Sequence, residues 1–210
     1  PGTGTKMVCD VFDGCGSTPF GQEMDLPNGF EMTAVIPGGS SISSIEAPIT
    51  PYTHLATANA LACSSVTAAA VESANDAVDQ LVGVDIINTQ PVDITNQAAV
   101  NGASDSAIQY ALFISGMAET LNLGSDDFNN NLSSLGSAFE DGEIENGEEG
   151  FDLPTFISNV DNAVINASDH ENFSENAAAI NNASTQLDDV EEESSNGTWT
   201  PYSDNNGDGD

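Results

Sequence analysis

Negative charge constrains this chain more than any other feature. The 210 residues hold 34 Asp and Glu against one positively charged side chain, Lys6, so the formal net charge at pH 7 is −33. Such a surface repels nucleic acids, and we therefore exclude them as partners. Self-repulsion on this scale is tolerated best where salt screens it, which favours saline or alkaline surroundings outside the cell. We also expect the fold to depend on cations.

The strongest helix signals lie in residues 49–95. Thr50 followed by Pro51 predicts a helix start, because Thr can accept a bond from a free N–H and Pro loses nothing at the first position. This helix is expected to reach about Cys63. Ser65 is the predicted cap of a second helix, whose apolar residues recur at helical spacing until Gly83 ends it. The two helices predict a hairpin.

Four further helices follow from caps and apolar spacing. The third begins at Ser104 or Asp105 and ends at Gly124, and because it is the most apolar segment we expect it to be central. The fourth is capped by residues 125–127 and the fifth by Asp152. The sixth runs from about Glu171 to Val190, where the acidic run DDVEEE should fray because negative charge is unfavourable at a helix C-terminus.

Two or three short strands are expected before the helices. Lys6–Phe12 and Phe30–Ile36 are apolar runs next to Asp-Gly and Asn-Gly turns, and Ile42 with Ile45 is a candidate edge pairing. We therefore predict a mainly α protein of α+β type, a multi-helix bundle with a small N-terminal antiparallel β element. Residues 1–48 form the β segment packed on the helices, 49–190 the helical domain, and 191–210 an acidic linker or tail.

Several short motifs resemble those of bacterial secreted and cell-surface modules of the lipoprotein or adhesin kind. They are PITPYTHLA, VESANDAVDQLVGVDI, TQPVDI, AIQYALFISGMAETL and the acidic FEDGEIENGEEG. An apolar strand precedes them, and the resemblance as a whole spans roughly residues 20 to 160. The family pattern has a Thr-Pro-x-Thr-x-Leu-Ala helix and an acidic Asp-Gly-x-Ile-x-Gly loop. This chain departs from it at Tyr52, where Leu is usual, and in lacking a lipobox Cys. The resemblance implies an exported surface module and no particular chemistry.

The three cysteines fit an exported protein. Cys9 and Cys15 are predicted to form a disulfide that closes a short loop around Asp13-Gly14. Two interpretations stay open for Cys63 on the first predicted helix. It is either a buried small hydrophobe or a partner that bridges to Cys9 or Cys15.

Calcium is the cofactor that the acidic motifs predict. The C-terminal DNNGDGD offers oxygen donors in the first half of a calcium-loop pattern, at Asp204, Asn206, Asp208 and Asp210, although the pattern's final Glu is missing. A second, irregular site could use Asp141, Glu143, Glu145 and Glu148 in the loop 140–152. The alternatives are a solvated acidic tail and a solvated loop.

Catalytic signals are absent from the sequence. It has no phosphate loop, no GxSxG elbow and no HExxH, and His54 and His170 lack partners at zinc-ligand spacing. We therefore expect no enzyme. The N-terminus has no apolar signal region, which favours a processed, secreted or surface-displayed chain, and no stretch approaches the ~20 apolar residues of a membrane span.

The predicted function is structural. We expect an extracellular surface module that forms a homo-oligomer or polymer, as a fibre or adhesin-like subunit. The alternative is a carbohydrate- or peptide-binding module that uses Trp199, Tyr202 and Tyr52, with a glycan as the partner. Five Asn-x-Ser/Thr sequons are chemically usable for glycosylation, at Asn131, Asn166, Asn172, Asn182 and Asn196.

Overall fold

Helix α4 (Asp105–Thr120) runs through the middle of the fold. The computed structural model describes residues 6–27, 29–38 and 47–201. Ser104 caps α4 by accepting a hydrogen bond from the Ala107 N–H, and 11 of the 16 helical residues are buried. The prediction of a central helix at this place is confirmed. The helix ends at Thr120, before the predicted stop at Gly124, because Asn122 and Gly124 both take left-handed backbone conformations.

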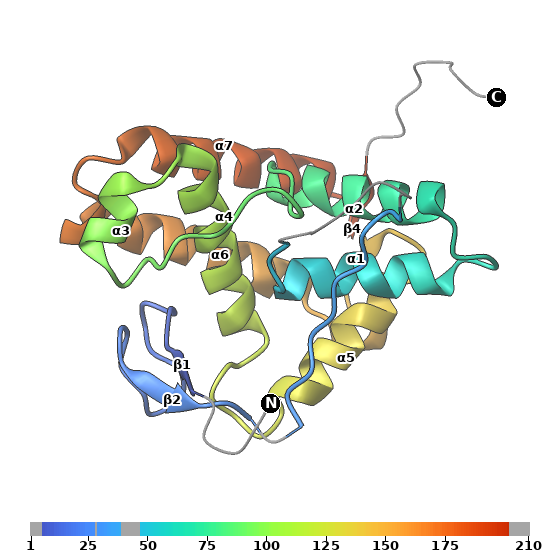
Figure 1. Cartoon of the computed structure of the whole chain (residues 1–210), viewed down its shortest axis with the longest axis horizontal. Coiled ribbons are helices and arrows are strands. Elements are labelled where there is room, and N and C mark those ends of the chain that lie inside the picture. Colours follow the sequence, from blue (N-terminus) through green and yellow to red (C-terminus); the bar gives the residue numbers. More distant parts are fainter. Residues whose placement is uncertain (1–5, 28, 39–46, 202–210) are drawn as a thin grey trace.

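Two long helices from the C-terminal half pack against α4. They are α6 (Leu153–Asp169), which Asp152 caps through the Thr155 N–H, and α7 (Ala177–Glu193). Figure 1 shows α4 crossing α6 and α7, with α1 (Pro51–Ala62) and α2 (Ala68–Val82) to the right of α4. A Cβ atom added to Gly116 on α4 would lie 2.6 Å from the Cα of Val160 on α6. The absence of a side chain at Gly116 therefore permits the close approach of α4 and α6.

The predicted limits of the last helix are wrong at both ends. Residues Glu171–Phe173 form the separate short helix η2, and α7 begins only at Ala177. At the other end α7 continues through the acidic run to Glu193, where we expected fraying. The Ser194 hydroxyl donates to the Val190 carbonyl at 2.6 Å and so satisfies one carbonyl of the last turn.

The predicted hairpin in the first half is confirmed. Helix α1 (Pro51–Ala62) packs on α2 (Ala68–Val82), and Gly83 ends α2 in a left-handed conformation. Thr50 and Thr53 exchange side-chain and backbone hydrogen bonds in a capping box at the start of α1. The cap of α2 is Thr67, two residues after the predicted Ser65.

Two shorter helices complete the bundle. Helix α5 (Phe128–Ala138) buries Phe128, Leu132 and Leu135 as its spacing predicts, and it packs on α1. Helix α3 (Gln97–Gly102) was not predicted. It is capped by the Asn96 side chain and contacts η2.

Strand pairing differs from the prediction. Strand β1 (Lys6–Val8) pairs antiparallel with β2 (Glu23–Asp25), which places Met7 opposite Met24. Residues 30–36 do not form a strand. Apolar side chains of this run pack on helices instead, as in the stacking of Phe30 on Phe128 with ring centroids 5.8 Å apart. Strands β3 (Ile144–Glu145) and β4 (Thr198–Trp199) also pair antiparallel and were not expected. The candidate pairing of Ile42 with Ile45 lies outside the described residues.

One hydrophobic cluster joins the N-terminal segment (residues 6–38) to the helices. It contains Cys9, Val11 and Cys15 from that segment together with the buried side chains of α4, α5, α6 and α7. A small second cluster of Ala60, Val71 and Ala74 lies inside the α1–α2 hairpin. The mainly helical architecture with a small antiparallel β element is therefore confirmed.

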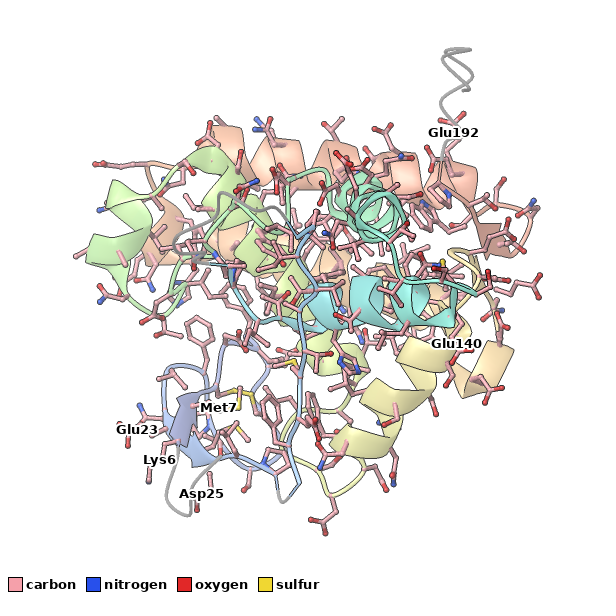
Figure 2. The ribbon with its side chains drawn as sticks, turned by 45° about the vertical axis from the view of Figure 1, so that its right-hand side comes forward. Lys6, Met7, Glu23, Asp25, Glu140 and Glu192 are labelled. Carbon is pink, nitrogen blue, oxygen red and sulfur yellow. A yellow bond between two sulfur atoms is a disulfide. The ribbon has the colours of Figure 1, made fainter. Side chains whose placement is uncertain are left out.

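The acidic side chains labelled in Figure 2 lie far apart on the fold, with Glu23 and Asp25 on β2, Glu140 after α5 and Glu192 on α7. In the part of the chain that the structure describes, the single ion pair joins Lys6 on β1 to Glu23 on β2 at 3.8 Å, and both side chains are exposed. Exposed pairs of this kind contribute little stability. Burial, helix caps and backbone hydrogen bonds therefore hold the fold together. Among the described residues, none of the helices combines the length and the apolar character that spanning a membrane requires.

Candidate functional site

The predicted disulfide between Cys9 and Cys15 is present, with both cysteines buried. The loop that it closes turns at Gly14, whose φ is +98° and whose N–H donates to the Val11 carbonyl. The Ser115 hydroxyl on α4 donates to the Asp10 carbonyl at 2.7 Å and so fixes the loop on the central helix.

Aromatic contacts fix the other side of this loop. Phe12 stacks on Phe20 with ring centroids 4.7 Å apart, and Phe20 lies 5.4 Å from the His170 ring at the end of α6. Phe173 of η2 is 6.1 Å from Phe12. His170 also accepts from the Asn172 N–H, so it has a structural role in this cluster.

Both interpretations of Cys63 are wrong. Cys63 is a free thiol, and it is exposed in the turn between α1 and α2. Its nearest partner is the Asn59 carbonyl one turn back along α1, at 3.7 Å. Helix α1 ends at Ala62, so Cys63 lies outside the packed part of the hairpin.

The aromatic residues proposed for glycan binding do not form an exposed surface. Trp199 and Tyr52 both have 0% exposure. Trp199 lies on β4, which pairs with β3, and its ring stacks on Phe139. The Tyr52 hydroxyl donates to the Phe113 carbonyl. Within the predicted linker or tail of residues 191–210, Trp199 is therefore part of the packed core instead. Tyr202 lies outside the described residues.

The acidic loop between α5 and α6 does not gather its carboxylates. Asp141 accepts from the backbone N–H of Glu143, and Ile144–Glu145 is held by pairing with β4. A left-handed Gly147 and the short helix η1 (Glu148–Gly150) then turn the chain back toward α6. Over the described ranges, no group of three or more His, Cys, Asp or Glu side chains is placed to hold a metal ion. The set Asp141, Glu143, Glu145 and Glu148 is thus not brought together as ligands.

The Glu148 carboxyl nevertheless interacts with neighbouring negative charges. Desolvation raises the pKa of its carboxyl, and the negative charges of Asp141, Glu145 and Glu149 raise it further. Charge repulsion of this kind is what an acidic loop without counter-ions should show. The other predicted calcium ligands, Asp204, Asn206, Asp208 and Asp210, lie outside the described residues, and calcium binding there stays a prediction.

Two carboxyl groups differ from the solvated acids, and no local sequence pattern distinguishes either of them from the many others. Asp79 on α2 accepts from the Ile86 N–H at 2.8 Å, and burial raises its pKa to about 6, with a further contribution from Asp85 and Asp76. Asp10 in the disulfide loop has its pKa raised to about 6 by burial, with Asp93 adding repulsion. Perturbed carboxyls of this kind are candidates for function or for pH-dependent stability.

A surface groove with a volume of about 550 Å³ lies between α6 and α7. Asp161, Asp188 and Glu191 border it, together with Ser158 and apolar side chains. His54, the remaining histidine, is half-buried on α1 beside the Thr33 hydroxyl at 3.1 Å, and burial lowers its pKa. His54 and the groove belong to different parts of the fold, since His54 lines a separate hollow beside Glu31 and Thr33.

The five sequons differ in how accessible they are. Asn172 is buried, with its amide donating to the Ile94 carbonyl, and the Asn131 amide donates to the Leu121 carbonyl. Asn182 and Asn196 are exposed. Glycosylation of the folded protein is therefore compatible with the latter two positions.

Comparison with models of protein families, with curated proteins and with solved structures gives no match in any of the three cases. The resemblance to bacterial surface modules accordingly stays a prediction.

Proposed function

We propose that this protein is a structural, self-associating module of an extracellular or cell-surface assembly. The observation that carries the proposal is the turn between α1 and α2, which we call the hairpin tip (residues 61–69). Every residue of the tip is exposed, including Cys63 and the aliphatic side chains of Leu61 and Val66, which are 60% and 52% exposed.

The tip is also the surface where two copies can approach with the least repulsion. No Asp or Glu occurs from residue 47 to residue 71, although the chain carries 34 acids. A fold with net charge −33 repels itself over most of its surface, so association is favoured where charge is missing and apolar side chains are exposed. Glu140 borders this region, where its carbonyl accepts from the Asn59 side chain.

The redox state of the cysteines supports an oxidising location. Disulfides persist outside the cytosol, and the chain contains one buried disulfide together with one exposed thiol. An exposed thiol in such surroundings can form a bridge between two copies. The same surroundings would supply the salt that screens the remaining surface.

Light scattering coupled to size-exclusion chromatography, without reductant and at low and high sodium chloride, tests the proposal. We expect oligomers that grow with salt, and a covalent dimer on non-reducing gels. Leu61→Ser with Val66→Ser should abolish the non-covalent association, whereas Cys63→Ser should remove only the covalent dimer. Electron microscopy of the same material shows whether the assembly is a fibre.

Ile165→Ser is the matched control, because Ile165 on α6 is 51% exposed but lies outside the tip. This variant should associate as the unaltered protein does. A monomer in every salt concentration, or equal loss of association in the Ile165 and tip variants, would contradict the proposal.

A further inference from the structure

A small apolar cavity lies between the N-terminal segment and α4. Its volume is about 220 Å³, and apolar side chains form most of its wall, among them Met7, Met32 and Ile114. Asp10 is the one ionisable residue among the twelve that line it. The cavity therefore combines an apolar wall with a single acid.

The Asp10 carboxylate has an unsatisfied oxygen. Its Oδ1 atom is shielded from solvent and has no hydrogen-bond partner among the described residues. Leaving a buried acceptor unpaired is unfavourable, and more so when the group is charged. The backbone of Asp10 is held between the Cys9 disulfide and the hydrogen bond from the Ser115 hydroxyl, which fixes the position from which the side chain extends.

The wall beside Asp10 favours an organic cation over a metal ion. Calcium and magnesium require several oxygen ligands, and this cavity offers one carboxylate. The remaining polar liner, Thr50, already shares its hydroxyl with the Tyr110 hydroxyl at 2.7 Å. The rings of Phe30 and Phe128, stacked at 5.8 Å, contribute aromatic faces, which attract ammonium groups and accept alkyl chains.

We propose that this cavity binds small organic ammonium compounds, with the ammonium group donating to Asp10 and the hydrocarbon body lying against Phe30, Phe128 and the methionines. The strongly negative surface would raise the local concentration of such cations. Burial raises the pKa of Asp10 to about 6, so the carboxyl is ionised at pH 8 and gains from a positive partner there. This inference is independent of the self-association proposed above.

Methionine-methyl NMR of the intact protein provides the test, with hexylammonium as the probe at pH 8 in 0.5 M sodium chloride. Of the four methionines, Met7 and Met32 line the cavity, whereas Met24 and Met117 do not. We expect saturable shifts at Met7 and Met32 with a dissociation constant of about 1 mM or lower, as suits a ligand of this size. Hexanol, which is of equal length and neutral, should bind at least about tenfold more weakly, because it cannot form the charge-assisted bond.

The decisive variant is Asp10→Asn, and Asp13→Asn is its control because it changes the net charge equally at an exposed position. Asp10→Asn should weaken hexylammonium at least about tenfold and leave hexanol unchanged, while Asp13→Asn should change neither. The proposal is overturned if hexanol binds as tightly as hexylammonium, if Asp10→Asn has no effect, or if all four methyl signals move without saturation. If Asp10→Asn fails to fold, two measurements on the unaltered protein still test the proposal. They are the ratio of the dissociation constants of hexylammonium and hexanol, and the restriction of the methyl shifts to Met7 and Met32.

Discussion

The N-terminal segment and the α4–α6 contact lie in one hydrophobic cluster but are held by different means. Around α4 the chain buries long helices against each other, and Gly116 allows the α6 backbone to approach closely. In the N-terminal segment the regular structure is limited to three-residue strands, and a covalent bond closes the loop from Cys9 to Cys15. A segment with little regular structure gains stability from a cross-link, because the cross-link restricts the conformations of the unfolded chain. We therefore expect global unfolding when the α4–α6 contact is altered. Altering the N-terminal segment should cause only local opening.

Gly116→Ala should have the largest effect. The added Cβ would lie 2.6 Å from the Val160 Cα and 2.7 Å from its N, so the backbones of α4 and α6 must separate. We expect a loss of about 3 kcal/mol in the free energy of unfolding, measured by urea denaturation. Gly136→Ala is the matched control, because its Cβ would meet Ala58 at an ordinary 3.5 Å. It should be neutral or stabilising by up to about 1 kcal/mol, and equal losses in both variants would contradict the close-approach argument.

Removing the disulfide should have the next largest effect. Cys9→Ser with Cys15→Ser is expected to cost about 2 kcal/mol, the value for a loop this short. Hydrogen exchange should accelerate in residues 6–25 while α4, α6 and α7 keep their protection. Cys63→Ser should leave exchange unchanged, since Cys63 is free and exposed. Simultaneous loss of protection in α4 would show that the segment and the core unfold as one unit.

The pH dependence of stability should come from both regions. Asp10 in the N-terminal segment and Asp79 on α2 each have a folded pKa of about 6, above the ordinary 3.8. The folded state therefore binds protons more tightly, and stability should increase as pH falls from about 7 to about 4. Asp79→Asn keeps an acceptor for the Ile86 N–H and should raise stability at pH 8 by about 1 kcal/mol, a value reduced for its partial exposure.

Asp10→Asn should act in the same direction, and thermal melts at pH 8 and pH 5 separate the two contributions. Each single variant should have a flatter dependence on pH than the unaltered protein. A steeper dependence in either would mean that the carboxyl is stabilised in its charged form.

Calcium should have the smallest effect on unfolding. We expect binding in the millimolar range at residues 204–210, as for weak extracellular loops. Weak binding adds little to the free energy of unfolding, so melts in millimolar calcium chloride and in sodium chloride of equal ionic strength should differ by only a few tenths of a kcal/mol. Calorimetric binding should disappear on deleting 204–210 and persist in Asp141→Asn with Glu148→Gln. The reverse pattern would place the ion in the loop before α6.

Local signals predicted most helices because their physical cause is local. Thr50-Pro51, Ser104 and Asp152 each satisfy free N–H groups of the turn that follows them, and all three mark real helix starts. Strands were predicted poorly, because pairing depends on distant residues. Strand β2 has one buried side chain, Met24, in a polar context, and no local pattern announces that Glu23–Asp25 pairs with β1.

The same limit applies to functional candidates. The Cys9–Cys15 bridge follows from short spacing and was predicted, whereas the exposure of Cys63 depends on where α1 ends. Trp199 looked like part of a tail because its partners, Ile144 and Phe139, lie more than fifty residues earlier. Asp10 could not be told from the other acids by type, since only tertiary packing shields its Oδ1 atom from water.

The lone Lys6 on β1 has a consequence for the digestion of this protein by proteases. Trypsin-like proteases require Lys or Arg before the cleaved bond, and this sequence has one such residue. Cleavage there would release the residues that precede Met7 and leave the Cys9–Cys15 loop and all the helices in one piece. The scarcity of cleavage sites for this class of protease therefore follows from the amino-acid composition. It stays the same when the fold opens.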